Sequence, residues 1–269
     1  MTRVGVLGAG GRMGREVCRA IADDPDLELV AAVDPALAGI DLRQVIGEDA
    51  AGLQVAGDVE DLERSGAQVA VDFTVADAAV EHMRWCASHG VHAVVGTTGI
   101  RVGVLDELGA LFESSAANCV MAANFAIGAV LMMRFAELAA PFMDGVEIVE
   151  LHHDGKLDAP SGTALTTADR LVKARDGAGC DPWPSDRTAS EVLAGARGGE
   201  GPGGIRIHSV RLHGLVAHQE VLFGAVGQSL SIRHDAFDRT SFMPGMILAV
   251  KAVSGRPGLT VGLDTLLGF

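Results

Sequence analysis

The sequence predicts two domains: an N-terminal α/β domain with a parallel sheet, and a smaller α+β domain with an open, mixed, mostly antiparallel sheet. In the first half, short apolar runs alternate with helix-length segments, which is typical of parallel strands covered by helices on both faces. From Val146 the pattern changes to shorter strands joined by turns. We expect residues 1–126 and 239–269 to form the first domain and residues 127–238 the second.

The first domain is expected to alternate strands and helices. Apolar runs predict its strands at Arg3–Leu7, Leu27–Val33, Gln68–Phe73, His92–Val95 and Asn118–Ala123. Between the first two strands, the segment Arg12–Ala22 has its apolar residues on one side at helical spacing. The last helix, expected at Arg239–Val253 with an interruption near Pro244, returns to this domain.

The second domain is expected to contain two helices and a sheet. The helices are predicted at Ala126–Met143 and Thr163–Arg175, and a strand at Val146–Leu151. Further strands, predicted to be antiparallel, lie at Arg206–Val216, Glu220–Ala225 and Ser229–His234. The Gly/Pro/Ser-rich stretch 177–204 is predicted to be a loop, and a loop of this length is usually functional or mobile.

The composition excludes several kinds of partner. The chain has 269 residues, of which 48% are apolar and 21% charged, and its net charge is −14. Because nucleic-acid-binding proteins carry basic patches, no nucleic-acid partner is expected. No apolar run reaches the roughly 18 residues of a membrane span, so no membrane partner is expected either. Four scattered cysteines are typical of reduced thiols in a cytoplasmic protein: Cys18, Cys86, Cys119 and Cys180.

A glycine-rich turn, VGVLGAGGRMGRE, follows the first predicted strand and opens the first predicted helix. Its glycines fit the spacing G-x-x-G-x-x-G at Gly8, Gly11 and Gly14. Glycine permits the tight turn and lets the backbone approach a pyrophosphate, which the free N–H groups of the helix start then bind. A glycine-rich turn without a ligand is the alternative. The context of strand and helix favours a Rossmann-like dinucleotide site.

Asp34 ends the second predicted strand, 20 residues after Gly14. A carboxylate at this place bonds the ribose hydroxyls of a dinucleotide and disfavours a 2′-phosphate, which favours NADH. Arg12 or Arg43 could reach a phosphate, so NADPH remains open. An ordinary turn residue before Pro35 is the alternative interpretation of Asp34.

Polar and glycine-rich loops follow the later strands of the predicted parallel sheet. They are Asp72–Thr74, Gly96–Gly99 and Ala122–Phe125. Ligands of an open α/β sheet bind outside the carboxyl ends of its strands, where all three loops fall. Gly96 and Gly99 would let the backbone approach a nicotinamide ring, and the hydroxyls of Thr97 and Thr98 could fix its carboxamide. Ordinary turn chemistry is the alternative.

The segment ELHHDGKLDAPSGTA, Glu150–Ala164, concentrates polar chemistry far from the glycine loop. Pro160 disfavours helix at the residue before it, and Ser161 stands where a helix N-cap belongs. The helix start that follows, Gly162 and Thr163, offers N–H groups to an anion.

The basic residues of the same segment favour a carboxylate or phosphate as that anion. Lys156 and His153 add positive charge or hydrogen-bond donors beside the helix start. A surface histidine pair followed by a simple cap is the alternative. No metal is expected, because the neighbouring residues His152 and His153 point to opposite faces of a strand.

A nicotinamide cofactor combined with a carboxylate pocket suggests hydride transfer to an unsaturated acid. After the hydride arrives at one atom, the neighbouring atom must be protonated, and histidine and lysine are suitable acids near neutral pH. A cationic pair would also stabilise transient negative charge.

These motifs together resemble the 4-hydroxy-tetrahydrodipicolinate reductase (dihydrodipicolinate reductase) family of lysine and diaminopimelate synthesis. GAGGRMG, DFT, GTTG, AANF and above all ELHHDGKLDAPSGTA carry the resemblance, which covers nearly the whole chain in order. It implies an NADH- or NADPH-dependent reductase of a small cyclic dicarboxylate, built as a homotetramer through the sheets of the substrate domain.

The resemblance also implies residue roles. His152 matches the family's proton donor or acceptor and Lys156 its second proton donor. The substrate-carboxylate contacts fall on His153, Ser161, Gly162 and Thr163. The cofactor contacts fall on Gly8, Ala9, Gly10, Gly11, Arg12, Met13, Asp34, Gly96, Thr97, Thr98, Ala122, Ala123, Asn124 and Phe125.

The chain departs from the family at two positions beside the predicted acids. Relatives often have histidine at the position of Gly155 and a basic residue or proline at that of Asp154, so the rim of this pocket is less positive. Two other functions remain as alternatives. One is another two-domain nicotinamide dehydrogenase, such as an aspartate dehydrogenase-like enzyme, and the other is a non-catalytic NAD-sensing protein.

Overall fold

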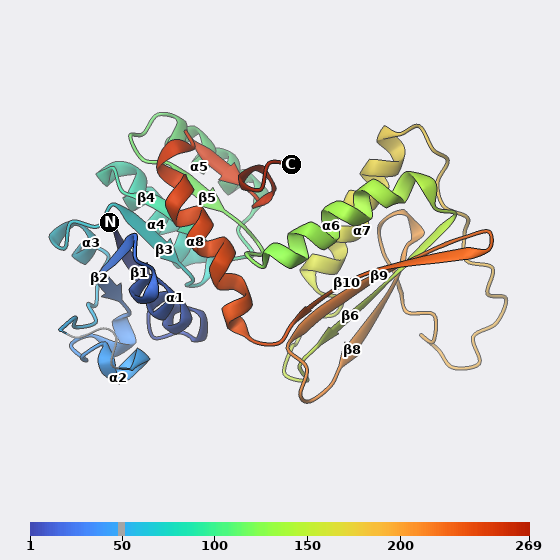
Figure 1. Cartoon of the computed structure of the whole chain (residues 1–269), viewed down its shortest axis with the longest axis horizontal. Helices are drawn as coiled ribbons and strands as arrows, with labels where there is room; N and C mark the ends of the chain where they lie inside the picture. Colours follow the sequence, from blue (N-terminus) through green and yellow to red (C-terminus); the bar gives the residue numbers. More distant parts are fainter. Residues whose placement is uncertain (48–51) are drawn as a thin grey trace. The chain divides into compact units, whose positions relative to one another are not determined.

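The computed structural model describes residues 1–47 and 52–269. The chain divides into two compact units, one formed by residues 1–126 and 239–269 and the other by residues 127–238 (Figure 1). The roles in cofactor and substrate binding that the sequence assigns to these two parts remain predictions.

The first unit is built on a six-stranded parallel sheet in the order β11-β5-β4-β3-β1-β2. Its strands are β1 (Thr2–Leu7), β2 (Leu27–Val33), β3 (Val69–Asp72), β4 (His92–Val95), β5 (Cys119–Met121) and β11 (Leu259–Val261). The parallel α/β fold expected from the sequence is confirmed. The sequence did not predict β11, whose three residues are too few to form a periodic pattern.

Helices cover this sheet and complete its core. They are α1 (Arg12–Asp23), α2 (Arg43–Ile46), α3 (Asp61–Arg64), α4 (Ala76–His89), α5 (Val102–Glu113) and α8 (Met243–Ala252). The helix expected at Arg239–Val253 is in fact the 3-10 turn η5 (Arg239–Phe242) followed by α8 and the 3-10 turn η6 (Val253–Gly255). Pro244 lies in the first turn of α8, where a residue without an N–H is tolerated.

The strand order places a topological switch between β1 and β3. From β1 the chain runs to β2 on one side, and then crosses to β3 on the other side. Loops from the carboxyl ends of β1 and β3 therefore diverge, and this crevice is where open α/β sheets bind ligands.

The second unit contains a five-stranded mixed sheet in the order β10-β9-β6-β8-β7. Its strands are β6 (Gly145–His152), β7 (Gly199–Glu200), β8 (Arg206–Arg211), β9 (Ala217–Ala225) and β10 (Gln228–Ala236). The expected antiparallel arrangement is confirmed for β6, β9 and β10. For the segment predicted at Arg206–Val216 it is only partly right, because β8 ends at Arg211 and pairs antiparallel with β7 but parallel with β6. A parallel partner requires a long crossover, which α7 and the segment after it supply.

Two helices lie on one face of this sheet, α6 (Ile127–Ala139) and α7 (Gly162–Gly177) (Figure 1). The helix predicted up to Met143 instead ends at Ala139 and continues as the 3-10 turn η3 (Ala140–Phe142), which contains Pro141. A proline in a helix interior removes a hydrogen bond and clashes with the preceding turn, so the α-helix does not continue through it.

The stretch 178–198, predicted to be a loop, has no regular strand or helix but is attached to the unit. The indole Nε1 of Trp183 donates to the carbonyl of Met143 at 3.1 Å. The guanidinium of Arg175 lies 4.7 Å from the centroid of the Trp183 ring. After this stretch come β7 and the 3-10 turn η4 (Pro202–Gly204), both within the predicted loop.

Candidate active site

The glycine loop between β1 and α1 is shaped by close backbone contacts. Gly8 has φ +78°, and a Cβ there would lie 3.0 Å from Cγ2 of Thr74. A Cβ on Gly14 would come within 2.0 Å of the carbonyl oxygen of Gly8. Only glycine fits position 14, since any side chain would push α1 away from the end of β1. The exposed Arg12 and the half-buried Met13 begin the helix.

Asp34 holds this loop in place by hydrogen bonds and also lines the cavity beside it. Its Oδ2 accepts a hydrogen bond from the N–H of Gly10 at 2.9 Å, and its Oδ1 accepts one from the N–H of Ala36 at 3.0 Å. The residue therefore holds the glycine loop and the chain after β2 together at the edge where a ribose would lie.

A cavity of about 570 Å³ opens at the carboxyl ends of β1, β2 and β3. Its walls include residues of the glycine loop and three carboxylates, among them Gly8, Gly11, Asp34, Asp58, Glu60 and Thr74. This size suits a small molecule or part of a cofactor. The cavity coincides with the topological switch, which is where open α/β sheets bind their ligands.

The loops after β3 and β4 are joined through a buried carboxylate. Asp72, only 2% exposed, accepts hydrogen bonds from the hydroxyl and N–H of Thr74 and lies 2.7 Å from Nδ1 of His82. The hydroxyl of Thr97 lies 3.3 Å from Asp72 and 3.2 Å from the carbonyl of Thr74. The Thr97 hydroxyl thus connects the two loops, whereas we expected it to fix the carboxamide of a nicotinamide. Thr98 is exposed.

The loop after β5 is fixed from within. Oδ1 of Asn124 accepts from the N–H of Ala126 at 2.8 Å. Phe125 is buried, with its ring 5.9 Å from that of Phe73, while Ala123 is exposed and Ala122 is buried. A Cβ on Gly96 would lie 2.1 Å from the same Phe73 ring. The predicted cofactor residues of the first unit all follow strand ends at one edge of its sheet.

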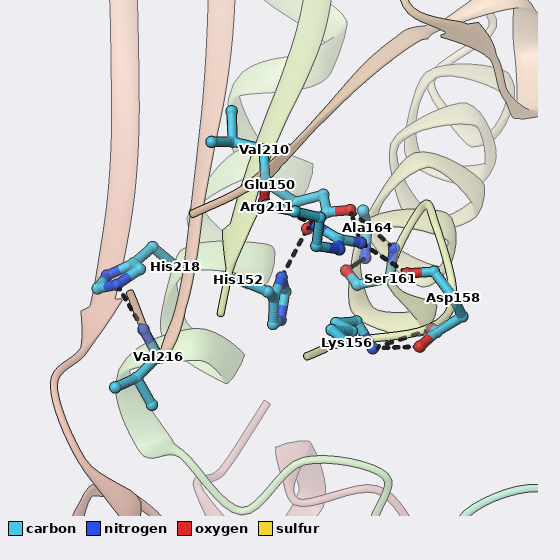
Figure 2. A network of polar contacts seen from close by, with 10 residues as sticks. All are labelled: Glu150, His152, Lys156, Asp158, Ser161, Ala164, Val210, Arg211, Val216 and His218. Atoms are coloured by element: carbon cyan, nitrogen blue, oxygen red, sulfur yellow. Dashed lines mark hydrogen bonds and ion pairs between the residues drawn. The ribbon is translucent and has the colours of Figure 1, made fainter. Parts of the chain in front are cut away.

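In the second unit, a buried carboxylate lies at the centre of a polar network (Figure 2). Glu150 on β6 is 0% exposed. Its Oε2 lies 2.6 Å from Nδ1 of His152. Arg211 donates one hydrogen bond to Oε2 at 2.9 Å and one to Oε1 at 2.8 Å. Burial raises the pKa of Glu150, but the hydrogen bonds from His152 and Arg211 outweigh it and lower the pKa to about 2.

The loop after β6 carries the second predicted acid. Nζ of Lys156 lies 2.7 and 2.9 Å from the two carboxylate oxygens of Asp158. Arg211 also donates to the carbonyl of Asp158 at 2.7 Å, so this loop is attached to the same network. His153 lies beside the turn, where a Cβ on Gly155 would be 3.3 Å from its Nδ1.

Helix α7 begins next to Glu150. Ser161 is the N-cap, as predicted, and its Oγ accepts from the N–H of Ala164 at 3.2 Å. The N–H of Ser161 donates to Oε1 of Glu150 at 3.2 Å. The N–H groups of Gly162 and Thr163 lie in the first turn, where a helix has no internal acceptor for them. This helix start is able to bind a carboxylate.

Glu150, Asp158 and Arg211 were not among the predicted site residues. Glu150 is two residues before His152 and therefore on the same face of the strand, which was the available signal. Arg211 is 61 residues away from Glu150 in the sequence, and the sequence contains no pattern that joins the two.

Neither a metal site nor a membrane span is present in the described part of the chain. Between residues 1–47 and 52–269, no three His, Cys, Asp or Glu side chains form a group that could hold a metal ion. Over the same residues, no helix is both long and apolar enough to cross a bilayer.

The doubly wound sheet, together with the similarity to known proteins, defines the class as a pyridine-nucleotide-dependent reductase. The chain belongs to the dihydrodipicolinate reductase family. The model of the N-terminal part of dihydrodipicolinate reductase matches residues 2–125, and that of its C-terminal part matches residues 128–267. The family resemblance found in the sequence is thereby confirmed.

Named relatives agree with this assignment. A 4-hydroxy-tetrahydrodipicolinate reductase from Nocardia farcinica is 50% identical over 266 residues, covering 98% of each chain. A second 4-hydroxy-tetrahydrodipicolinate reductase, from Cutibacterium acnes, is 50% identical over 272 residues, and the match covers 100% of both chains.

Among solved structures, dipicolinate-bound dihydrodipicolinate reductase from Paenisporosarcina sp. TG-14 superposes with a TM-score of 0.84. It is 39% identical, and the match covers 98% of this chain and 99% of that one. An amine dehydrogenase from Mycobacterium smegmatis, at 18% identity and a TM-score of 0.64 over 98% of this chain and 95% of its own, shares the fold alone.

Proposed function

We propose that the enzyme uses NADH or NADPH to reduce the dehydrated form of 4-hydroxy-tetrahydrodipicolinate to tetrahydrodipicolinate, in lysine and diaminopimelate synthesis. The observation that carries the proposal is the polar network of the second unit. There, a histidine, a lysine and a helix N-terminus that can bind an anion follow one another within 15 residues. The family membership and the dipicolinate-bound relative support the same substrate class.

The bound nicotinamide supplies a hydride to the unsaturated ring of the substrate. We assign the binding of a substrate carboxylate to the start of α7 and a nearby histidine. The residues are His153, Ser161, Gly162 and Thr163. His152 and Lys156 then supply the proton that the neighbouring ring atom requires. Lys156 is paired with Asp158, and a bound anion would compete for its ammonium group.

For the cofactor, the assigned contacts follow the strand ends of the first unit. Gly8 to Met13 bind the pyrophosphate and Asp34 the ribose. Gly96–Thr98 and Ala122–Phe125 would hold the nicotinamide. The backbone, rather than the hydroxyl of Thr97, makes the contact there, because that hydroxyl is used by Asp72 and Thr74.

The cavity favours NADH over NADPH. Asp34, Asp58 and Glu60 line it, and a 2′-phosphate would add negative charge beside these carboxylates. Arg43, which could have bound such a phosphate, is paired with Asp41 at 2.9 Å. The ratio of kcat/KM for the two cofactors tests this preference.

The assembly is proposed to be a homotetramer formed through the sheets of the second unit. Helices α6 and α7 cover one face of the sheet (Figure 1). Ile148 and Glu150 are on this face, because Ile148 packs in one core cluster with residues of both helices and Glu150 accepts from the N–H of Ser161 at the start of α7. Val149, Leu151 and Leu222 point to the opposite face, where Leu222 is 37% exposed. The same face also carries the charged Glu147 and Glu220, so a second copy would cover a mixed apolar and charged surface. Light scattering of the wild type and of Leu222→Arg tests it, with a smaller species expected for the variant.

The cytoplasm is the proposed compartment. Cys18, Cys86 and Cys119 are buried and unpaired, and burial raises the pKa of each thiol. Thiols in this state agree with a reducing environment.

Competition by pyridine-2,6-dicarboxylate distinguishes the proposed function from its alternatives. NADH oxidation is followed with substrate generated by the preceding synthase, at several concentrations of the inhibitor. Competitive inhibition supports the reductase. An aspartate dehydrogenase-like enzyme would instead reduce NAD⁺ with aspartate, and an NAD-sensing protein would bind cofactor without any turnover.

A further inference from the structure

We propose that Glu150 is the positioning residue of this site, and that its carboxylate selects which nitrogen of His152 delivers the proton. The inference rests on the proposed function for its catalytic meaning. Its structural part concerns the free enzyme and stands independently of the reaction.

The carboxylate of Glu150 connects three elements of the second unit. Oε2 lies 2.6 Å from Nδ1 of His152 and 2.9 Å from Nη1 of Arg211. Oε1 lies 2.8 Å from Nη2 of Arg211 and 3.2 Å from the N–H of Ser161. One buried group thus holds the acid at the end of β6, the guanidinium from β8 and the start of α7 in a fixed arrangement (Figure 2).

The contact defines the tautomer of the ring. An ionised carboxylate only accepts hydrogen bonds, so Nδ1 of His152 must carry a hydrogen. Glu150 remains ionised at neutral pH because its pKa is lowered to about 2 against the effect of burial. The proton that leaves His152 during a reaction therefore comes from Nε2, and the ring returns to the Nδ1–H form.

The charges around the ring come from few elements. Glu150 lies on the same strand, Arg211 lies directly opposite His152 on β8, and Lys156 and Asp158 lie in the following loop. On β9, the residue opposite His152 is the uncharged Ala217. The first turn of α7 brings only the uncharged residues Gly162 and Thr163. Glu150 is therefore the carboxylate whose negative charge directly faces the positive charges of Arg211 and of a protonated His152 ring.

The first experiment measures the ring directly in the wild-type enzyme. Nitrogen-15 NMR of the histidine rings reports which nitrogen carries the hydrogen, and the His152 signals are assigned by their loss in His152→Asn. The Nδ1–H form is expected for the neutral ring. The Nε2–H form would overturn the proposal, whether or not the enzyme reduces the expected substrate.

The second experiment uses Glu150→Gln, whose amide still accepts from the N–H of Ser161 but can present an NH₂ group to Nδ1. We expect kcat to fall by about 10²–10⁴-fold, the scale seen when a histidine loses its orienting carboxylate. The substrate KM should change less than about threefold.

Glu137→Gln is the control, since this carboxylate of α6 also pairs with arginines but lies outside the site. Its kcat and KM should match those of the wild type. If Glu150→Gln keeps the wild-type kcat, or if its KM rises by a factor comparable to its loss of kcat, Glu150 has no positioning role. If that variant does not fold, the NMR result decides. A wild-type enzyme without turnover would contradict the proposed function and leave the tautomer result valid.

Discussion

Nδ1 of His152 lies 2.6 Å from the carboxylate of Glu150, two residues earlier on the same strand. Residues at this spacing share a face, so strand geometry alone brings the proposed proton donor and its partner together. Arg211 completes the arrangement from the neighbouring parallel strand, directly opposite His152. The site therefore depends on the register between β6 and β8 as much as on the motif in the sequence.

Removing either acid should stop turnover while preserving cofactor binding. His152→Ala and Lys156→Ala are each expected to lower kcat by about 10²–10⁴-fold, the usual contribution of a general acid. The Kd for NADH, measured by fluorescence titration, should stay within about twofold. Lys173→Ala, on the exposed side of α7, is the control and should behave like the wild type. Near-normal turnover in both variants would remove these residues from the chemistry.

Gly14→Ala should disrupt the nucleotide loop. The added Cβ would lie 2.0 Å from the carbonyl oxygen of Gly8, so the start of α1 must shift. We expect the free energy of unfolding to fall by about 1–3 kcal/mol, as for other overpacked sites, together with weaker NADH binding. Gly109→Ala on α5 meets no atom within 4 Å and should be neutral or slightly stabilising. Equal urea midpoints for the two variants would refute the packing argument.

Glu60→Gln should weaken the discrimination against NADPH. The exposed Glu60 lines the cavity, and removing its charge reduces the repulsion of a 2′-phosphate. Because an exposed charge is worth roughly 0.2–1 kcal/mol, kcat/KM for NADPH should rise about 1.5- to 5-fold. The value for NADH should not change. An unchanged ratio of the two cofactors would place the 2′ position away from Glu60.

Acid should destabilise the second unit through Glu150. Its pKa is about 2 in the folded chain against an ordinary value of 4.5, so its contribution is complete above pH 4.5 and is lost as the pH falls toward 2. The shift corresponds to about 3 kcal/mol. Urea unfolding of the wild type and of Glu150→Gln between pH 6 and pH 2.5 measures it. The difference should shrink with decreasing pH, whereas a constant difference would contradict the linkage.

The sequence predicted the parts of the fold that follow from local patterns. Apolar runs and the glycine spacing located β1 to β5 and α1, and the N-cap Ser161 located the start of α7. It did not reveal β11 or the parallel pairing of β6 with β8, because these depend on contacts between distant segments.

The site was predictable to the same extent. His152, Lys156 and the α7 start belong to one segment, and the sequence indicated them. Arg211 enters from another strand, and the inward direction of the Thr97 hydroxyl depends on the buried Asp72. Such features require the tertiary structure.

Transfer of deuterium from cofactor to product tests the central proposal most directly. The enzyme is supplied with NADH dideuterated at C4 of the nicotinamide and with substrate generated by the synthase, and the product is analysed by mass spectrometry. The proposed reduction predicts tetrahydrodipicolinate that carries one deuterium, in amounts equal to the NADH consumed. NADH oxidation no faster than in a synthase-only blank, or a product without deuterium, would contradict it.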